Sequence, residues 1–196
     1  MKSQPFNADQ FVVDEWRSLG FYYDFDDRIS DNQWRFFGSK KGLQHFVTLL
    51  DDYTSNVNND KLFEHEHYGP YCYLKIITLD GESSITPHAI GGSIADLRYL
   101  RNIVAEKLIK SQPGDTFNID KEFGSNNEAT AKFFVMSDNF DPVSMDELIV
   151  SGRQQIVNNH RKSSLSFSVS PLRRCISYWS SQIVRKVRVS RRRTFK

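Results

Sequence analysis

The sequence has no apolar run close to the roughly 20 residues that a bilayer-spanning helix needs, so it predicts no transmembrane helix. Its N-terminus has early acidic residues and no continuous apolar core, which argues against a secretory signal peptide. Only two cysteines are present, Cys72 and Cys175, and two cannot build a disulfide framework. These absences together predict a protein of the reducing cytoplasm.

Catalytic motifs are also missing. The sequence contains no G-x-S-x-G elbow, no H-E-x-x-H and no C-x-x-C, and its acidic residues are scattered as on a solvated surface. Gly91-Gly92-Ser93 opens a predicted helix but lacks the full G-x-G-x-x-G pattern of dinucleotide binding. We therefore predict no catalytic residue, no cofactor and no cofactor-binding residue, which favours a protein that is not an enzyme.

Acidic residues are absent from residues 151–196, and this absence divides the chain. Residues 1–150 hold all 24 Asp and Glu but only 14 of the 26 Lys and Arg, a net charge of −10. Residues 151–196 hold the other 12 Lys and Arg and no acid, a net charge of +12. Such a shift in composition marks a boundary. We predict a leader or short helix over 1–18, an acidic domain over 19–147 and a basic tail over 148–196.

The acidic part shows the apolar periodicity of a folded domain. Ser39 and Ser93 suit helix N-caps, and apolar residues at spacings of three and four follow each of them, which predicts two amphipathic helices. Aromatic or β-branched runs bounded by turn residues predict strands. These runs cover residues 21–25, 34–37, 62–67, 71–79, 85–90, 116–123 and 130–137.

The two helices align at an offset of 54 residues, with Gly38-Ser39 matching Gly92-Ser93. A strand precedes each Gly-Ser pair and another follows each helix, which indicates a ββα unit used twice. Because each helix has one apolar stripe, it must bury that stripe against a sheet. We predict an α+β fold of two layers, a mostly antiparallel sheet with both helices on one face. The alternative is that the Gly-Ser pattern is only a common strand-to-helix junction.

The densest cluster of functional side chains lies at residues 64–71. In a strand, His65 and His67 point to one face and acidic neighbours to the other. We predict a partner-binding surface here, made of Glu64, His65, Glu66, His67, Tyr68 and Tyr71. His65 and His67 are also candidate metal ligands, but a zinc site needs three or four ligands. The third ligand stays open among His45, His88, Asp80 and Glu82.

The basic tail carries its own pattern. Apolar residues at helical spacing predict an amphipathic helix near 171–189, flanked by arginine and lysine. Through residues 171–196 this tail could bind an anionic membrane, nucleic acid or the acidic part of the same chain. The abrupt change to a Ser/Arg-rich sequence also fits an altered reading frame at the end of the gene.

Part of the chain resembles a group of small, largely bacterial α+β proteins of unknown biochemistry, and partly the immunity proteins of bacterial polymorphic toxin systems. In those proteins a G-[SN]-x-x-G-L-x-x-L helix precedes a strand with H-x-H. The resemblance covers residues 33–76, and more weakly 92–104, and its matching positions are Gly38, Ser39, Gly42, Leu43, Phe46, His65 and His67. It implies binding to a partner protein and no catalysis.

The charge of the acidic part also implies binding to a partner protein, because a domain with a net charge of −10 attracts basic partners and repels nucleic acid. Plain solubility is the alternative reason for such a charge. We therefore expect a non-catalytic protein-binding domain with a basic partner protein, in the form of an immunity protein that neutralises a toxin. The alternatives are a metal-dependent enzyme that uses His65 and His67, and a membrane- or nucleic-acid-binding protein that uses the tail.

Overall fold

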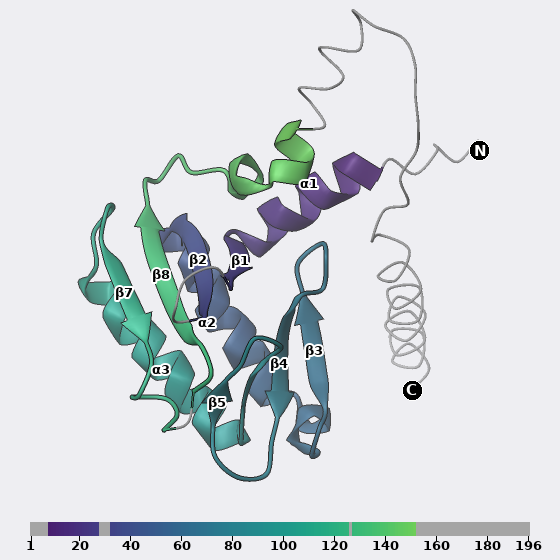
Figure 1. Ribbon diagram of the computed structural model, residues 1–196, viewed down its shortest axis with the longest axis vertical. Helices are drawn as coiled ribbons and strands as arrows, with labels where there is room; N and C mark the ends of the chain where they lie inside the picture. The colour runs from purple at the N-terminus through teal and green to yellow at the C-terminus, as the bar shows by residue number, and fades with distance from the viewer. Residues whose placement is uncertain (1–7, 28–31, 126, 152–196) are drawn as a thin grey trace, which may run out of the picture. The chain divides into compact units, whose positions relative to one another are not determined.

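The computed structural model describes residues 8–27, 32–125 and 127–151 (Figure 1). The chain divides into two units, Met1–Asn158 and Asn159–Lys196, and the second lies wholly outside the described residues. The predicted helix near 171–189 and Cys175 therefore lie outside them as well. Within the described part, no helix combines the length and the apolar character that crossing a bilayer would require.

The first of two four-stranded sheets has the order β1-β2-β8-β7. Its strands are β1 (Tyr22–Asp26), β2 (Gln33–Ser39), β7 (Thr116–Ile119) and β8 (Thr130–Met136). The central strands β2 and β8 are parallel, and each has an antiparallel neighbour on its other side. Buried and half-exposed residues alternate along β2, because Trp34 and Phe36 point into the core while their neighbours point away from it.

The second sheet repeats this plan in the order β3-β4-β6-β5. Its strands are β3 (His65–Tyr68), β4 (Leu74–Thr78), β5 (Ser84–Ile85) and β6 (Ile90–Gly92). Here β4 and β6 form the parallel centre, and β3 and β5 pair antiparallel at the edges. Leu74, Ile76 and Thr78 are the buried residues of β4, so alternate residues of that strand face the core.

Two long helices lie behind the strands in the view of Figure 1 and pack against each other. They are α2 (Lys40–Ser55) and α3 (Ile94–Lys110). Phe46 of α2 packs its ring against Phe36 and Phe133, at 5.0 and 5.4 Å between ring centroids. The apolar stripes predicted from the sequence are therefore the faces that the helices bury.

The strand order shows how the duplication is built. Each half of the body has the order ββαββ, and each sheet contains the first strand pair of one half and the last pair of the other. The helix starts are equivalent, because the Ser39 hydroxyl accepts a hydrogen bond from Gly42 N and the Ser93 hydroxyl from Asp96 N. The ββα unit used twice is thus present, and an exchange of strand pairs joins its two copies.

The predicted α+β class is confirmed, and four of the six strand pairings among the described residues are antiparallel. The strands divide between two sheets where we expected one. The single strand predicted over 85–90 is wrong, since β5 and β6 are short antiparallel strands joined by a turn. Thr86 N donates to Ala89 O across this turn, and Pro87, which has no N–H, lies inside it. The strand predicted over 116–123 ends at Ile119.

The N-terminal segment is helical from Ala8, within the region predicted as a leader or short helix. This helix, α1 (Ala8–Leu19), packs against the 3-10 helix η2 (Pro142–Met145). Trp16 is 1% exposed and its indole Nε1 donates to the carboxylate of Asp146 at 2.7 Å. Asp146 therefore ties the C-terminal end of the described chain to α1.

Candidate functional site

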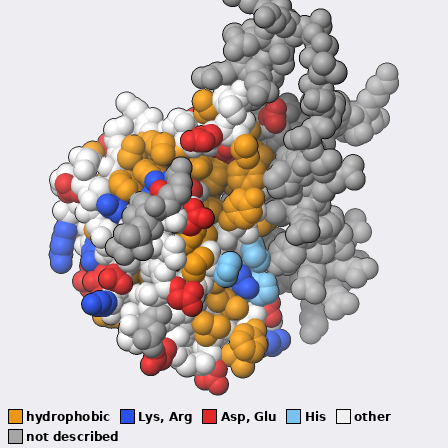
Figure 2. All heavy atoms as spheres, in the orientation of Figure 1, with side chains coloured by type: hydrophobic (Ala, Val, Ile, Leu, Met, Phe, Trp, Pro, Cys, Tyr) orange, Lys and Arg blue, Asp and Glu red, His pale blue; other side chains and the backbone are white. Residues whose placement is uncertain are grey.

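The β3–β4 hairpin lies at the edge of the second sheet and presents two histidines on the face away from the core. His65 is paired in register with Ile77 and His67 with Lys75, whereas the residues that alternate with these in β4 are buried. The two imidazole rings lie 5.3 Å apart between centroids, at an interplanar angle of 78°. Figure 2 shows histidine side chains beside hydrophobic ones in this part of the surface.

The acidic residue between the histidines has a structural role. Glu66 accepts hydrogen bonds from the Asn59 amide and the Tyr68 hydroxyl, each at 3.0 Å. Asn59 belongs to the 3-10 helix η1 (Val57–Asp60), so these contacts hold β3 against the segment that follows α2. Of the predicted partner-binding residues, Glu66 and Tyr68 thus engage each other and the body of the protein.

Tyr71 is also held within the protein. Its hydroxyl donates to the carboxylate of Asp146 at 2.8 Å, the same carboxylate that binds Trp16. Glu64 is exposed, while its backbone carbonyl accepts from the Tyr53 hydroxyl. The predicted cluster therefore separates into Glu64, His65 and His67, which reach the surface, and Glu66, Tyr68 and Tyr71, which brace the hairpin.

Three exposed apolar residues lie in the segments that lead into β3 and β4, and the sequence analysis missed them. Leu62 is 50% exposed, Phe63 64% and Tyr73 60%. Phe63 also has a φ of 63°, a left-handed conformation that is an outlier for a bulky residue. The sequence pattern carried no signal for this angle, because an aromatic before H-x-H suggests a strand. We name Leu62, Phe63, His65, His67 and Tyr73 the hairpin surface.

Burial is the largest cause of the pKa shifts around the hairpin, and nearby acidic groups add to those of its tyrosines. Burial raises the pKa of Tyr68, and the charges of Glu66 and Asp52 raise it further. Burial likewise raises the pKa of Tyr53, with contributions from Glu66 and Glu64. On the other face, burial lowers the pKa of His67, which favours its neutral form. The hairpin surface thus places apolar side chains and His67 near the carboxylates of the hairpin.

The predicted third metal ligand does not appear near the histidine pair. Within the ranges that the structure describes, no group of three or more His, Cys, Asp or Glu side chains is placed to hold a metal ion. His45 is on α2 and His88 on the β5–β6 turn. A metal-dependent active site of the usual three-ligand kind is thus not assembled by these residues.

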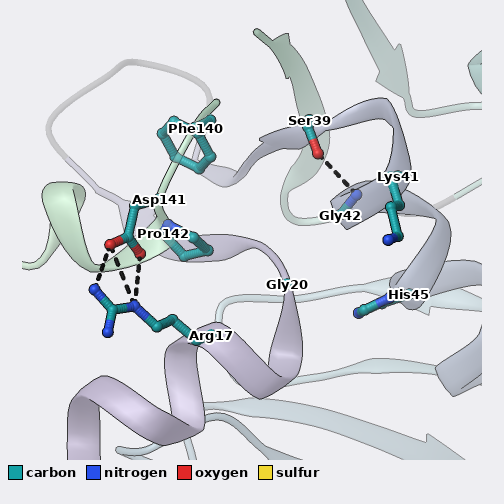
Figure 3. A pocket seen from close by; sticks show the side chains of 9 residues that line it. All are labelled: Arg17, Gly20, Ser39, Lys41, Gly42, His45, Phe140, Asp141 and Pro142. Carbon is teal, nitrogen blue, oxygen red and sulfur yellow. Dashed lines mark hydrogen bonds and ion pairs between the residues drawn. The ribbon is translucent and has the colours of Figure 1, made fainter. Parts of the chain in front are cut away.

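A separate cavity of about 270 Å³ lies at the start of α2 (Figure 3). Lys41 and His45 line one side of it and Phe140 and Pro142 the other. Arg17, at its rim, pairs with Asp141 at 2.7 Å, and His45 Nδ1 lies 3.2 Å from Leu19 O.

Two glycines that line this cavity, Gly20 and Gly42, bring their backbones close together. A Cβ on Gly42 would lie 2.1 Å from the carbonyl oxygen of Gly20, whose own φ is +84°, so both positions require glycine. Ser39 lines the cavity, and its hydroxyl caps α2 by accepting from Gly42 N. No lining hydroxyl is hydrogen-bonded to a lining base, so these residues do not form a nucleophile–base pair.

Three half-buried tyrosines predict a loss of stability at alkaline pH. Burial and the Asp24 charge raise the pKa of Tyr22 to about 12, and burial with nearby carboxylates raises the pKa of Tyr68 and Tyr71. An unfolded tyrosine loses its proton near pH 10, before the folded one does, so the free energy of unfolding falls as pH rises above about 10. Urea denaturation between pH 8 and 12 should show this fall, with a smaller slope for Tyr22→Phe. A midpoint that stays constant to pH 12 would contradict it.

Comparisons with known proteins found no relative of this chain. No protein-family model matches it, and neither a curated protein nor a solved structure does. The geometry of its own residues therefore carries the functional conclusion.

Proposed function

We propose that the acidic α+β body is a non-catalytic protein-binding domain that takes a basic partner protein on the hairpin surface. In its most specific form this is an immunity protein that neutralises a toxin in the cytoplasm. The observation that carries the proposal is Phe63, a large apolar side chain that is 64% exposed on a left-handed backbone.

This conformation is costly. A non-glycine residue in the left-handed region costs on the order of 1–3 kcal/mol, and such residues cluster at functional sites. An exposed Phe63 gains little burial to offset that cost, and Tyr73 is exposed on the same hairpin. Aromatic side chains are enriched in the cores of protein–protein interfaces, where a few of them supply most of the binding energy. A partner that covers Phe63 and Tyr73 would supply the missing burial.

Charge supports the choice of a basic partner. The part of the chain up to residue 150 has a net charge of −10, and Glu64 and Asp52 are exposed close to the hairpin. Opposite potentials speed the encounter of two proteins and suppress wrong partners, while an acidic surface repels nucleic acid. The resemblance of residues 33–76 to immunity proteins favours the same class of partner.

Affinity capture from a lysate of the source cells tests the proposal. The full chain is immobilised as the wild type, as the double variant Phe63→Ser/Tyr73→Ser, and as the control Val57→Ser. Val57 is 83% exposed but lies on η1, outside the hairpin surface. We expect the wild type and the control to retain a basic protein that the double variant retains at least about tenfold less, since interface anchors contribute 2 kcal/mol or more.

The dependence of this retention on salt concentration gives a second test. Retention by the wild type should weaken as NaCl rises from low to high concentration, because the charges involved are exposed. The proposal fails if the double variant retains every protein that the wild type retains, or if the protein that depends on Phe63 and Tyr73 is acidic.

A further inference from the structure

We propose that Tyr71 positions the hairpin surface for its partner, and that residues 147–151 regulate this surface through the carboxylate that Tyr71 binds. The inference rests on the proposed function, because the surface in question is the one that takes the partner. It adds what holds that surface in place and which other segment of the chain can change it. Tyr71 acts through Tyr73, an exposed member of the hairpin surface that its ring contacts.

Tyr71 joins a buried carboxylate to an exposed aromatic side chain. Its hydroxyl donates to Asp146 at 2.8 Å, and Asp146 is 2% exposed. Its ring lies 6.0 Å from the ring of Tyr73 between centroids, at an interplanar angle of 31°, within the range of interacting aromatic pairs. Tyr73 is 60% exposed. The position of this exposed ring is therefore tied to a buried residue near the C-terminal end of the described chain.

The backbone between the two tyrosines is strained. Cys72 has a φ of 57°, a left-handed conformation that is uncommon for a residue other than glycine. Such a conformation persists only where the surrounding contacts over-determine it. The backbone N–H of Cys72 donates to Gly69 O at 3.1 Å, and its carbonyl oxygen accepts from His67 Nδ1 at 2.7 Å. The hydroxyl bond of the preceding tyrosine adds a third constraint, so without it we expect the turn to relax and Tyr73 to move.

Asp146 extends this constraint to the C-terminal end of the described chain. One of its oxygens accepts from the Tyr71 hydroxyl, and the other accepts from the backbone N–H groups of Leu148 and Ile149, at 3.0 and 3.3 Å. These two N–H groups belong to the first turn of the short helical segment over 147–151. Networks of hydrogen bonds and packed side chains of this kind carry energetic coupling between sites. If the segment unwinds, Asp146 loses the bonds on one side and no longer fixes Tyr71, so the segment sets the position of the hairpin surface.

Aromatic ¹H–¹³C spectra of the full chain test the positioning role without any partner. Tyr71→Phe and Trp16→Phe each remove one donor to the same oxygen of Asp146, and each keeps an aromatic ring. Of these two side chains, Tyr71 is the one whose ring lies beside Tyr73. We expect the Tyr73 signals to shift in Tyr71→Phe and to stay close to their wild-type positions in Trp16→Phe. Unchanged Tyr73 signals in Tyr71→Phe, or equal shifts in both variants, would overturn the positioning role.

Two proline variants test the regulatory role of residues 147–151. Leu148→Pro removes an N–H that Asp146 accepts, and it disfavours the helical backbone of the residue before it. Glu147→Pro is the matched control, because proline suits the first position of a helix and the preceding Asp146 is extended, with a φ of −80° and a ψ of 98°. We expect Leu148→Pro to shift the Tyr73 signals and Glu147→Pro to leave them unchanged. Equal behaviour of the two proline variants would contradict the regulatory role.

The protein captured in the affinity test, purified and used as the probe, gives the functional readout. We expect Tyr71→Phe and Leu148→Pro to lower its affinity at least about fivefold, the lower end of coupling between sites, while Trp16→Phe and Glu147→Pro bind it as the wild type does. Equal binding by the wild type and Tyr71→Phe would overturn the inference and leave the proposed function standing. If no protein is captured, the proposed function fails and takes the regulatory role with it, and the Tyr73 spectra then decide the positioning role alone.

Discussion

Replacing Asp146 by alanine is expected to lower the free energy of unfolding by about 3–5 kcal/mol. Each buried donor left without an acceptor costs about 1–3 kcal/mol, and loss of the cap on the short helical segment over 147–151 costs about 1 kcal/mol. Asp146 is 2% exposed and accepts from Trp16 Nε1 and from the Tyr71 hydroxyl. Its other oxygen accepts from the backbone N–H groups of Leu148 and Ile149. Urea denaturation of the full chain measures the loss.

Two further variants make this prediction specific. Asp146→Asn keeps the shape and one carbonyl acceptor, so its loss should be smaller than that of the alanine variant. Asp138→Ala removes an exposed carboxylate from the same part of the chain and should stay within about 0.5 kcal/mol of the wild type. If Asp146→Ala is no less stable than Asp138→Ala, the buried network does not hold α1 and the hairpin to the C-terminal segment.

Truncation of Phe36 to alanine should cost about 3–5 kcal/mol, the range for a large aromatic in a core. Phe36 is fully buried and packs among five aromatic rings. Its ring stacks on Phe133 at 4.7 Å and packs against Phe46 and Phe21 at 5.0 and 6.1 Å. Chemical denaturation monitored by circular dichroism gives the value, and Phe36→Leu provides a measurable variant if the alanine protein does not fold.

The next residue is a matched control with the same chemistry on the opposite face. Phe37 is half-exposed and stacks on Phe134 at 4.4 Å, with Arg35 over its ring. Phe37→Ala should cost clearly less than Phe36→Ala, because it removes a cross-strand pair and opens no enclosed cavity. Equal losses for the two variants would mean that the inner face of the first sheet is not the core of the protein.

Local signals explain which elements the sequence predicted well. The start of each long helix is encoded within a few residues, by a serine that caps the first turn and an apolar stripe that follows it. The helix predicted to follow Ser39 is therefore confirmed as α2, which begins at Lys40. The alternation of His65 and His67 with acidic neighbours was equally local, since period two is a property of any strand.

Long-range pairing explains what the sequence did not predict. Nothing near Gln33 indicates that β2 pairs with β8, about a hundred residues later, so the division into two sheets was not expected. The role of Tyr71 depends on Asp146, 75 residues away. The left-handed backbone of Phe63 is set by the turn into β3, where Phe63 N donates to Thr78 O, and no residue type signals it.

The two halves of the duplication differ at the strand that carries the hairpin surface. In the first half, the edge strand β3 presents two histidines. In the second half, the corresponding edge strand is β7, and a lysine lies against it. Lys107 of α3 donates to the backbone carbonyl of Asn118 in β7 and pairs with Glu122 at 2.7 Å. Lysines protect strand edges from pairing with other chains. The duplication therefore supplies a common frame, and one half alone offers the hairpin surface.

Hydrogen exchange of the full chain, with and without its captured partner, tests the central claim most directly. The account predicts that the partner slows exchange over residues 62–75, which include β3 and the turn to β4, and leaves the backbone amides of α3 unchanged. Protection confined to α3, to the cavity at the start of α2 or to residues 152–196 would contradict the account, because the partner would then bind elsewhere than on the hairpin surface.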